Sequence, residues 1–267
     1  MQLYAGSSQQ FIDDTFQNRI AEKLRANFFA TMGYEVSQAE VRSWQNSLQQ
    51  MSAVLQYAGL KEQGVILEYQ LPLTSKRLDC LVTGKNAGRD PSAVIVELKQ
   101  WDTTAPSSIE DCVVTFLGGR LRDQLHPSRQ AGQYCQYLLD THTAFADDSI
   151  RLAACAYLHN LQFHPDDELF HDRHRASVER YPLFTGDQSP KLAEYLSDHV
   201  SHGEGLDVLA EIEGGKYRAS KKLLDHTAAM IEGQSEYVLL DEQLVVFNAV
   251  MDYARQGFRD RDQVVIL

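Results

Sequence analysis

The chain has 267 residues, 43% of them hydrophobic, and its 25 basic and 37 acidic residues give a net charge of −12. This composition supports a sizeable core, while no apolar run approaches the roughly 20 residues of a membrane-spanning helix. The acidic balance argues against long-range attraction to nucleic acid, because phosphate binding requires cations.

The compartment is inferred from the N-terminus and the cysteines. No basic segment followed by an apolar one opens the chain, so no secretory signal is predicted. Cys80, Cys112, Cys135 and Cys155 form no C-x-x-C pair. Cys80 and Cys155 fall in predicted strands, where a small buried apolar residue is the favoured interpretation. We therefore expect a reducing, cytoplasmic location.

Residues 8–32 are predicted to form one amphipathic helix that ends at Gly33. Its apolar residues recur at helical spacing, at Phe11, Phe16, Ile20, Leu24 and Phe28. Periodicity does not decide whether this face packs on the core or on a second copy in a homo-oligomer. Residues 1–36 are assigned to an N-terminal helical extension.

A second helix is predicted over 37–57, with one apolar face made by Val41, Trp44, Leu48, Met51 and Leu55. Ser37 and Glu40 at its start match a capping box, in which the glutamate bonds the backbone of the first turn. Glu40 could instead supply an acid to a metal site. The capping interpretation is favoured.

Three short strands are predicted next, over 64–70, 77–83 and 93–99. The second strand carries Asp79, and the third carries Glu97 and Lys99. Residues two apart on a strand share a face, so Glu97 and Lys99 point the same way. Two acids beside a lysine suit a hard cation held next to a point charge, as phosphodiester hydrolysis requires.

Other charged residues near these strands leave alternatives open. Glu68 is either a further metal ligand or an exposed strand residue, and Arg77 makes either a surface ion pair or a phosphate contact. From Lys76 to Gln130 there are eight basic and seven acidic residues, which leaves 17 basic and 30 acidic elsewhere. A groove for backbone phosphates is therefore hypothesised, lined by Lys76, Arg77, Arg120, Arg122 and Arg129.

The polar stretch 100–125 is predicted as a loop, with a segment at 112–117 that could be a strand. A helix begins near His126, Pro127 and Ser128. It places Gln130 and Tyr134 one turn apart on one face. They either face a site, which is favoured, or pack as a sheet-contacting Tyr and a solvated Gln. An apolar strand follows at 151–158.

The pattern of Asp79 followed by Glu97-Leu98-Lys99, in the order helix, three strands, helix, strand, resembles the PD-(D/E)XK nuclease superfamily over roughly 37–162. Gln130 and Tyr134 match the Q-x-x-x-Y element of its RecB-like branch. The resemblance implies an α/β fold with an α-β-β-β-α-β core, in which a mixed sheet is flanked by helices.

The same resemblance implies roles for the residues. Mg²⁺ or Mn²⁺ would be held by Asp79 and Glu97, and Glu68 and Glu40 would be further ligands. Lys99 would orient or polarise the attacking water. Gln130 and Tyr134 would support the site or its substrate.

After the strand at 151–158 the chain becomes polar and contains His159, His164, His171 and His174. No Cys accompanies them, so solvated histidines are favoured over a zinc site. Residues 163–236 are predicted as a helical connector, with short helices at 190–200, 206–212 and 220–231.

Residues 237–267 are predicted to hold a helix at 240–256 and a short strand at 263–267. Gln243 precedes that helix as an adenine-recognising Gln does in superfamily 1-type helicases, yet no P-loop motif occurs in the chain. The whole resembles the N-terminal part of bacterial nuclease–helicase proteins of the Schlafen group 3-like type. We expect 237–267 to begin a truncated helicase or ATPase domain.

The expected function is a metal-dependent nuclease acting on nucleic acid, with DNA favoured over RNA. An ATPase or helicase partner and a role in DNA processing or phage defence follow by analogy only. One alternative is a catalytically weak module that docks nucleic acid for such a partner. Another is a protein-interaction scaffold, in which the charged residues would form salt bridges.

Overall fold

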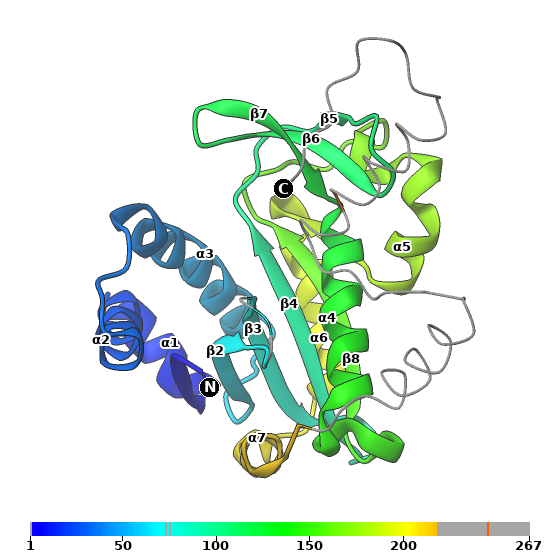
Figure 1. Cartoon of the computed structure of the whole chain (residues 1–267). Helices are drawn as coiled ribbons and strands as arrows, with labels where there is room; N and C mark the ends of the chain where they lie inside the picture. The colour runs from blue at the N-terminus through cyan, green and yellow to red at the C-terminus, as the bar shows by residue number, and fades with distance from the viewer. Residues whose placement is uncertain (1, 73, 75, 218–244, 246–267) are drawn as a thin grey trace, which may run out of the picture.

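A six-stranded mixed sheet with helices on both faces forms the centre of the protein, as a computed structural model shows (Figure 1). The structure describes residues 2–72, 74, 76–217 and 245. The strand order is β1-β2-β3-β4-β8-β9. Strands β1 to β4 pair antiparallel, whereas β8 lies parallel to both β4 and β9. The predicted α/β class with a mixed sheet flanked by helices is confirmed.

The elements have the following bounds. The sheet consists of β1 (Tyr4–Ser7), β2 (Gly64–Gln70), β3 (Arg77–Lys85), β4 (Pro91–Lys99), β8 (Arg151–Leu158) and β9 (Leu183–Thr185). The α-helices are α1 (Ser8–Phe16), α2 (Ile20–Met32), α3 (Gln38–Tyr57), α4 (Pro127–Thr141), α5 (Arg175–Arg180), α6 (Ser189–Val200) and α7 (Gly205–Gly214). A smaller sheet contains β5 (Ala105–Pro106), β6 (Cys112–Leu117) and β7 (Arg120–Leu125).

Alternate residues of the central strands feed two separate cores. Val94 and Val96 of β4 pack with α1, α2, α3 and α6, while Ala93 and Ile95 pack with α4 and α7. Because both sides of β4 are covered, the strand reads as a continuous apolar run, as buried strands do. Because both faces are buried, this strand and β8 could be recognised in the sequence as apolar runs.

The N-terminal segment differs from its prediction, because the single helix expected over 8–32 is wrong. A strand, β1, precedes two helices, and Asn18 between them has a φ of 56°. Asp14 is buried and accepts hydrogen bonds from Arg19 (3.0 Å) and Lys23 (2.6 Å), which fixes the turn. Both helices pack on the core through Phe11, Leu24 and neighbouring residues, while Phe16 ends α1 and is exposed.

The remaining predicted elements of the sheet are confirmed with small shifts. Helix α3 begins after Ser37, whose hydroxyl accepts a hydrogen bond from the backbone N–H of Glu40 at 3.1 Å. β3 extends two residues beyond its prediction, and β4 begins two residues earlier. The structure therefore has a helix, three strands, a later helix and a parallel strand in the expected order.

The stretch 100–125 is a small three-stranded sheet, and the prediction of a loop is wrong for most of it. The strand considered at 112–117 is confirmed as β6. β7 pairs with it across a turn at Gly118 and Gly119, both of which have positive φ (58° and 82°). Such a two-residue hairpin turn requires the conformational freedom of glycine.

The segment predicted as a separate connector packs, as far as Gly214, on the main sheet. β9 extends that sheet, α6 packs under β3 and β4, and α7 packs against β2 and β3. Helices α6 and α7 confirm two of the three predicted connector helices. The expectations for 220–231, 240–256 and 263–267, and for Gln243, lie outside the described residues.

All four cysteines are buried, and none of them forms a disulfide. The expectation of solvated histidines holds for His164 and His171. It is wrong for His159, which is half-buried and hydrogen bonds with the Ser47 hydroxyl at 3.1 Å, and for His174, which is buried and stacks on His126 with ring centroids 4.4 Å apart. Among the residues described, no helix is long and apolar enough to cross a membrane.

Candidate active site

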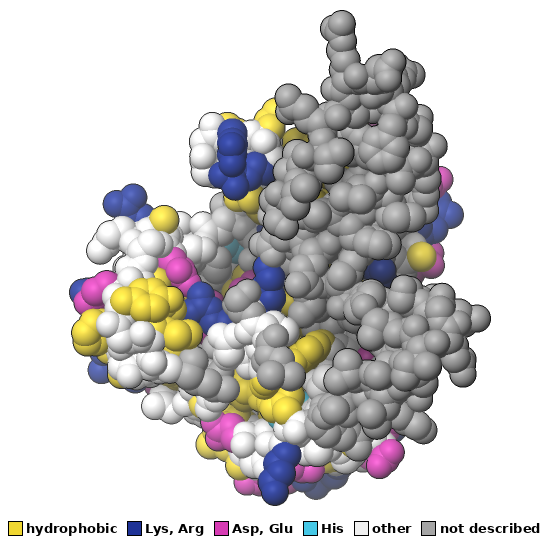
Figure 2. Space-filling view, viewed as in Figure 1, with side chains coloured by type: hydrophobic (Ala, Val, Ile, Leu, Met, Phe, Trp, Pro, Cys, Tyr) yellow, Lys and Arg dark blue, Asp and Glu magenta, His cyan; other side chains and the backbone are white. Residues whose placement is uncertain are grey.

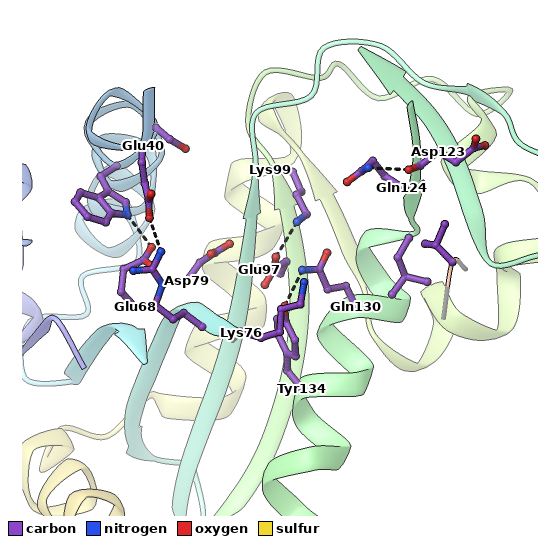
Figure 3. A pocket seen from close by; sticks show the side chains of 15 residues that line it. Glu40, Glu68, Lys76, Asp79, Glu97, Lys99, Asp123, Gln124, Gln130 and Tyr134 are labelled. Carbon is purple, nitrogen blue, oxygen red and sulfur yellow. Dashed lines mark hydrogen bonds and ion pairs between the residues drawn. The ribbon is translucent and has the colours of Figure 1, made fainter. Parts of the chain in front are cut away.

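A polar pocket of about 380 Å³ lies between α3 and α4, where β3 and β4 part (Figure 3). Nine of the twelve predicted site residues line it, namely Glu40, Glu68, Lys76, Arg77, Asp79, Glu97, Lys99, Gln130 and Tyr134. The β3–β4 pairing ends at Cys80 and Val96, and continuing that register places Asp79 opposite Glu97. The strand parity inferred from sequence therefore brings Asp79, Glu97 and Lys99 to one place.

The sheet is locally distorted at the pocket. Glu68 has a φ of 52°, in the left-handed region that a non-glycine residue rarely adopts. Its neighbours Leu67 and Tyr69 consequently pack in opposite cores although they are two apart. Leu78 and Cys80, which flank Asp79 on the next strand, do the same. Such strained backbone is concentrated at functional sites, because the surrounding structure must maintain it.

Asp79 is held at the floor of the pocket by β4. One carboxylate oxygen accepts a hydrogen bond from the backbone N–H of Leu98 at 2.7 Å. Its side chain also interacts with the Glu97 carboxyl, which is itself 2% exposed. Two carboxyl groups in contact at a buried site repel when both are ionised, so the arrangement favours a proton or a cation between them.

Lys99 completes the group. Its ammonium lies 2.8 Å from a carboxylate oxygen of Glu97 and 5.7 Å from the ring centroid of Trp101. The side chain remains 18% exposed. The ammonium can therefore reach the open part of the pocket while its contact with Glu97 offsets part of that carboxylate's burial.

Burial controls the protonation of the acids. It raises the pKa of Asp79 to about 6; the charge of Lys99 opposes this rise, and the charge of Glu68 reinforces it. Burial likewise raises the pKa of Glu68 to about 7, against the opposing charge of Arg77. Perturbed acids that share a cleft with a lysine mark a functional-site candidate on physical grounds.

Glu40 and Glu68 are bound to other side chains on one side of the pocket. Arg77 pairs with both, and its guanidinium is 3.1 Å from a Glu68 oxygen. The other Glu68 oxygen accepts a hydrogen bond from the indole N–H of Trp44 at 2.8 Å. Arg77 also lies over the ring of Phe28. These two acids thus belong to a partly buried ion-pair network around Arg77, and the favoured capping role of Glu40 is wrong because its carboxylate bonds Arg77 in place of the helix backbone. Asp79 and Glu97 are therefore the better candidates for metal ligands.

The donor set suits a small divalent cation. Among the described residues, no three His, Cys, Asp or Glu side chains converge as a group that could hold a metal ion. Mg²⁺ does not need three, because it commonly uses one or two carboxylates together with waters and substrate phosphates. Asp79 and Glu97 provide those two carboxylates, and their mutual repulsion would be relieved by a bound cation.

The Gln and Tyr of α4 lie together at the opposite wall. The side-chain amide of Gln130 donates a hydrogen bond to the Tyr134 hydroxyl at 2.9 Å. Tyr134 is buried in the core beneath α4, while Gln130 is half-buried at the pocket. The predicted common face is confirmed, and the core contacts of Tyr134 give it a packing role as well.

The five predicted basic residues separate into three groups. Lys76 and Arg77 both line the pocket, and Arg77 also pairs with Glu40 and Glu68. Arg129 pairs with Asp111 at 3.2 Å. Arg120 and Arg122 lie outside the pocket on β7, where both are exposed.

Six residues that line the pocket were not predicted as site residues, namely Ser43, Trp44, Asp123, Gln124, Leu125 and Val245. Trp44 reads as an apolar helix position, and only the structure shows its indole N–H bound to Glu68. Asp123 and Gln124 line the pocket from β7. The pair Gly118-Gly119 was the available signal for that hairpin, because adjacent glycines favour a tight turn between two strands.

Comparison with protein-family models gives no match. Comparisons with curated proteins and with solved structures give none either. Functional inference for this chain therefore depends on the geometry of the pocket.

Proposed function

We propose that the protein is a metal-dependent nuclease of the PD-(D/E)XK type that hydrolyses phosphodiester bonds. The observation that carries this proposal is the meeting of Asp79, Glu97 and Lys99 in one polar pocket. The order of a helix, three strands, a helix and a parallel strand around them supports the same type. So does the Gln130–Tyr134 pair, which corresponds to the Q-x-x-x-Y element.

Each residue has a chemical task in this proposal. Asp79 and Glu97 would hold one or two Mg²⁺ or Mn²⁺ ions, which would supply Lewis-acid stabilisation of charge on the phosphate. The Lys99 ammonium lies beside Glu97, where it orients the attacking water and stabilises developing negative charge. Gln130 adds a polar side chain at the rim, where it can orient substrate.

The main alternative is a nucleic-acid-binding module without activity. The Asp79 and Glu97 carboxyls favour the enzyme over this alternative, because two acids at the floor of a binding groove would repel phosphate. A protein that only bound nucleic acid would gain nothing from burying them. DNA is the favoured substrate by analogy with the superfamily, and a helicase or ATPase partner follows from the same analogy.

The proposal predicts metal-dependent cleavage of labelled DNA, to be tested on a single strand and on a duplex. The purified protein is expected to shorten the strands with Mg²⁺ or Mn²⁺ and to leave them intact with EDTA. Binding without cleavage at any divalent ion would instead support the binding module. If the protein neither binds nor cleaves DNA, both the nuclease and the binding module are contradicted, and the scaffold interpretation remains.

A further inference from the structure

The β6–β7 hairpin exposes apolar side chains that contribute little to the core. Phe116 is 55% exposed and Leu121 is 68% exposed, and the two are cross-strand partners near the turn. Figure 2 shows hydrophobic and basic side chains together on this projecting end of the molecule, at the upper left. An exposed aromatic ring on a projecting hairpin is a surface on which a nucleobase can stack.

The other face of the same hairpin carries positive charge. Arg120 and Arg122 are two apart on β7 and therefore share one face of the hairpin. Leu121 lies between them, so it and its partner Phe116 are on the opposite face. The guanidinium of Arg122 lies beside the turn, 3.5 Å from where a Cβ on Gly118 would stand. The tip of the hairpin thus combines one aromatic ring with two guanidinium groups.

The base of this hairpin is a wall of the candidate active site. Asp123, Gln124 and Leu125, at the end of β7, line the pocket. At about 3.3 Å per residue, the five steps from Gly119 to Gln124 span about 17 Å. A chain that crosses the tip can therefore continue along β7 into the pocket.

The depth of the pocket bears on the kind of nucleic acid that enters it. Glu97 is 2% exposed and Asp79 lies beside it at the pocket floor, and the hairpin projects above them. The surface between this hairpin and α3 is hollowed (Figure 2). A flexible single strand can bend into such a recess, whereas a stiff duplex must first be bent or opened at a free-energy cost.

We propose that the hairpin holds single-stranded nucleic acid, with a base stacked on Phe116 and backbone phosphates at Arg120 and Arg122. This inference rests on the proposed nuclease function, because it treats the hairpin as the substrate-holding part of that site. Stacking is tolerant of sequence, since every base presents a flat face. The substrate class is accordingly single strands or frayed ends, bound without sequence readout by this element.

Binding of a fluorescein-labelled oligo-dT strand, followed by anisotropy in EDTA, tests the inference without cleavage. The wild type is expected to bind this strand more tightly than an oligo-dA·oligo-dT duplex. Phe116→Ala should weaken strand binding roughly tenfold through loss of one stacked base. Arg120→Gln with Arg122→Gln should reduce the slope of log affinity against log salt by about 1.4, or 0.7 for each lost phosphate contact.

Matched controls separate the hairpin from general changes of charge and exposure. Phe16→Ala removes an 83% exposed Phe from the end of α1. Arg151→Gln with Arg175→Gln removes two exposed arginines that lie outside the pocket. These variants should bind like the wild type.

Tighter binding of the duplex, or wild-type affinity in both hairpin variants, would overturn the inference. Failure of the nuclease proposal has a different signature. In that case no divalent ion would produce cleavage, while hairpin-dependent binding of the strand would persist. A protein that cleaves but binds single strands independently of the hairpin would refute only the inference drawn here.

Discussion

Replacing Lys99 with Met should lower the rate of metal-dependent cleavage about 10²- to 10³-fold while the protein stays folded. The ammonium lies 2.8 Å from Glu97 and is 18% exposed, so its loss removes a charge from the site with little loss of packing. Loss of one preorganised charge or donor at a reacting centre typically has this magnitude. Rates at saturating Mg²⁺ on a labelled strand provide the measurement.

Lys61→Met is the control for Lys99→Met, because Lys61 is exposed and lies outside the pocket lining. It should cleave at the wild-type rate. Circular dichroism and thermal unfolding of both variants check that the fold is retained. A folded Lys99→Met protein that cleaves as fast as the wild type would remove Lys99 from the proposed mechanism.

Asp79→Asn should make the metal-free protein more stable at pH 8, by an amount on the order of 3 kcal/mol. The pKa of Asp79 rises from 3.8 to about 6 on folding, mainly because the carboxyl is buried. Each pH unit between those values is worth about 1.4 kcal/mol. An Asn keeps the shape and can still accept the hydrogen bond from the Leu98 N–H, but carries no charge to bury.

The pH dependence gives the sign of this effect. Below pH 4 the acid is protonated in both the folded and the unfolded state, so the variant and the wild type should be equally stable. Between pH 4 and 6 the unfolded state loses its proton first, which favours unfolding of the wild type. Above pH 6 both states are ionised and the deficit stays constant. Urea unfolding at pH 4 and pH 8 measures the difference.

Asp166→Asn is the matched control, because the Asp166 side chain is 89% exposed. Surface substitutions of this kind change the free energy of unfolding by about 0.5 kcal/mol or less. A saturating divalent cation should raise the stability of the wild type and have little effect on Asp79→Asn, since it binds the ionised folded site. Equal stability of Asp79→Asn and wild type at pH 8 would contradict the assigned burial of this charge.

Much of the fold was predictable because its central strands are buried on both sides. β4 and β8 read as apolar runs, and Glu97 and Lys99 could be assigned to one face because β4 is regular there. The cap at Ser37 was equally local, since it involves residues three apart. Not every local feature was recovered, because the Gly118-Gly119 turn was missed and Glu40 bonds Arg77 in place of the helix backbone.

Features set by distant contacts were not predictable from the sequence alone. The positive φ of Glu68 breaks the alternation on which strand parity depends. Arg77 pairs with Glu40 across 37 residues, and no local pattern indicates that contact. The break between α1 and α2 depends on Asp14 binding Lys23, whereas the apolar spacing runs through the break without interruption.

Small or polar strands were missed for a different reason. β7 is mostly exposed, so its side chains show no apolar alternation by which a strand is found. β9 has three residues, too few for a periodic signal, and pairs only at the edge of the sheet. The hairpin that forms a wall of the pocket was thus the part of the candidate site that was hardest to predict from the sequence.

The central claim is that Asp79 and Glu97 together hold a divalent cation. Anomalous diffraction from crystals grown with Mn²⁺ tests it most directly, because Mn²⁺ can be located without reference to activity. The proposal predicts an anomalous peak in contact with both carboxylates, and its loss in crystals of Asp79→Asn. Clear density for both side chains with no peak between them at saturating Mn²⁺ would contradict the claim.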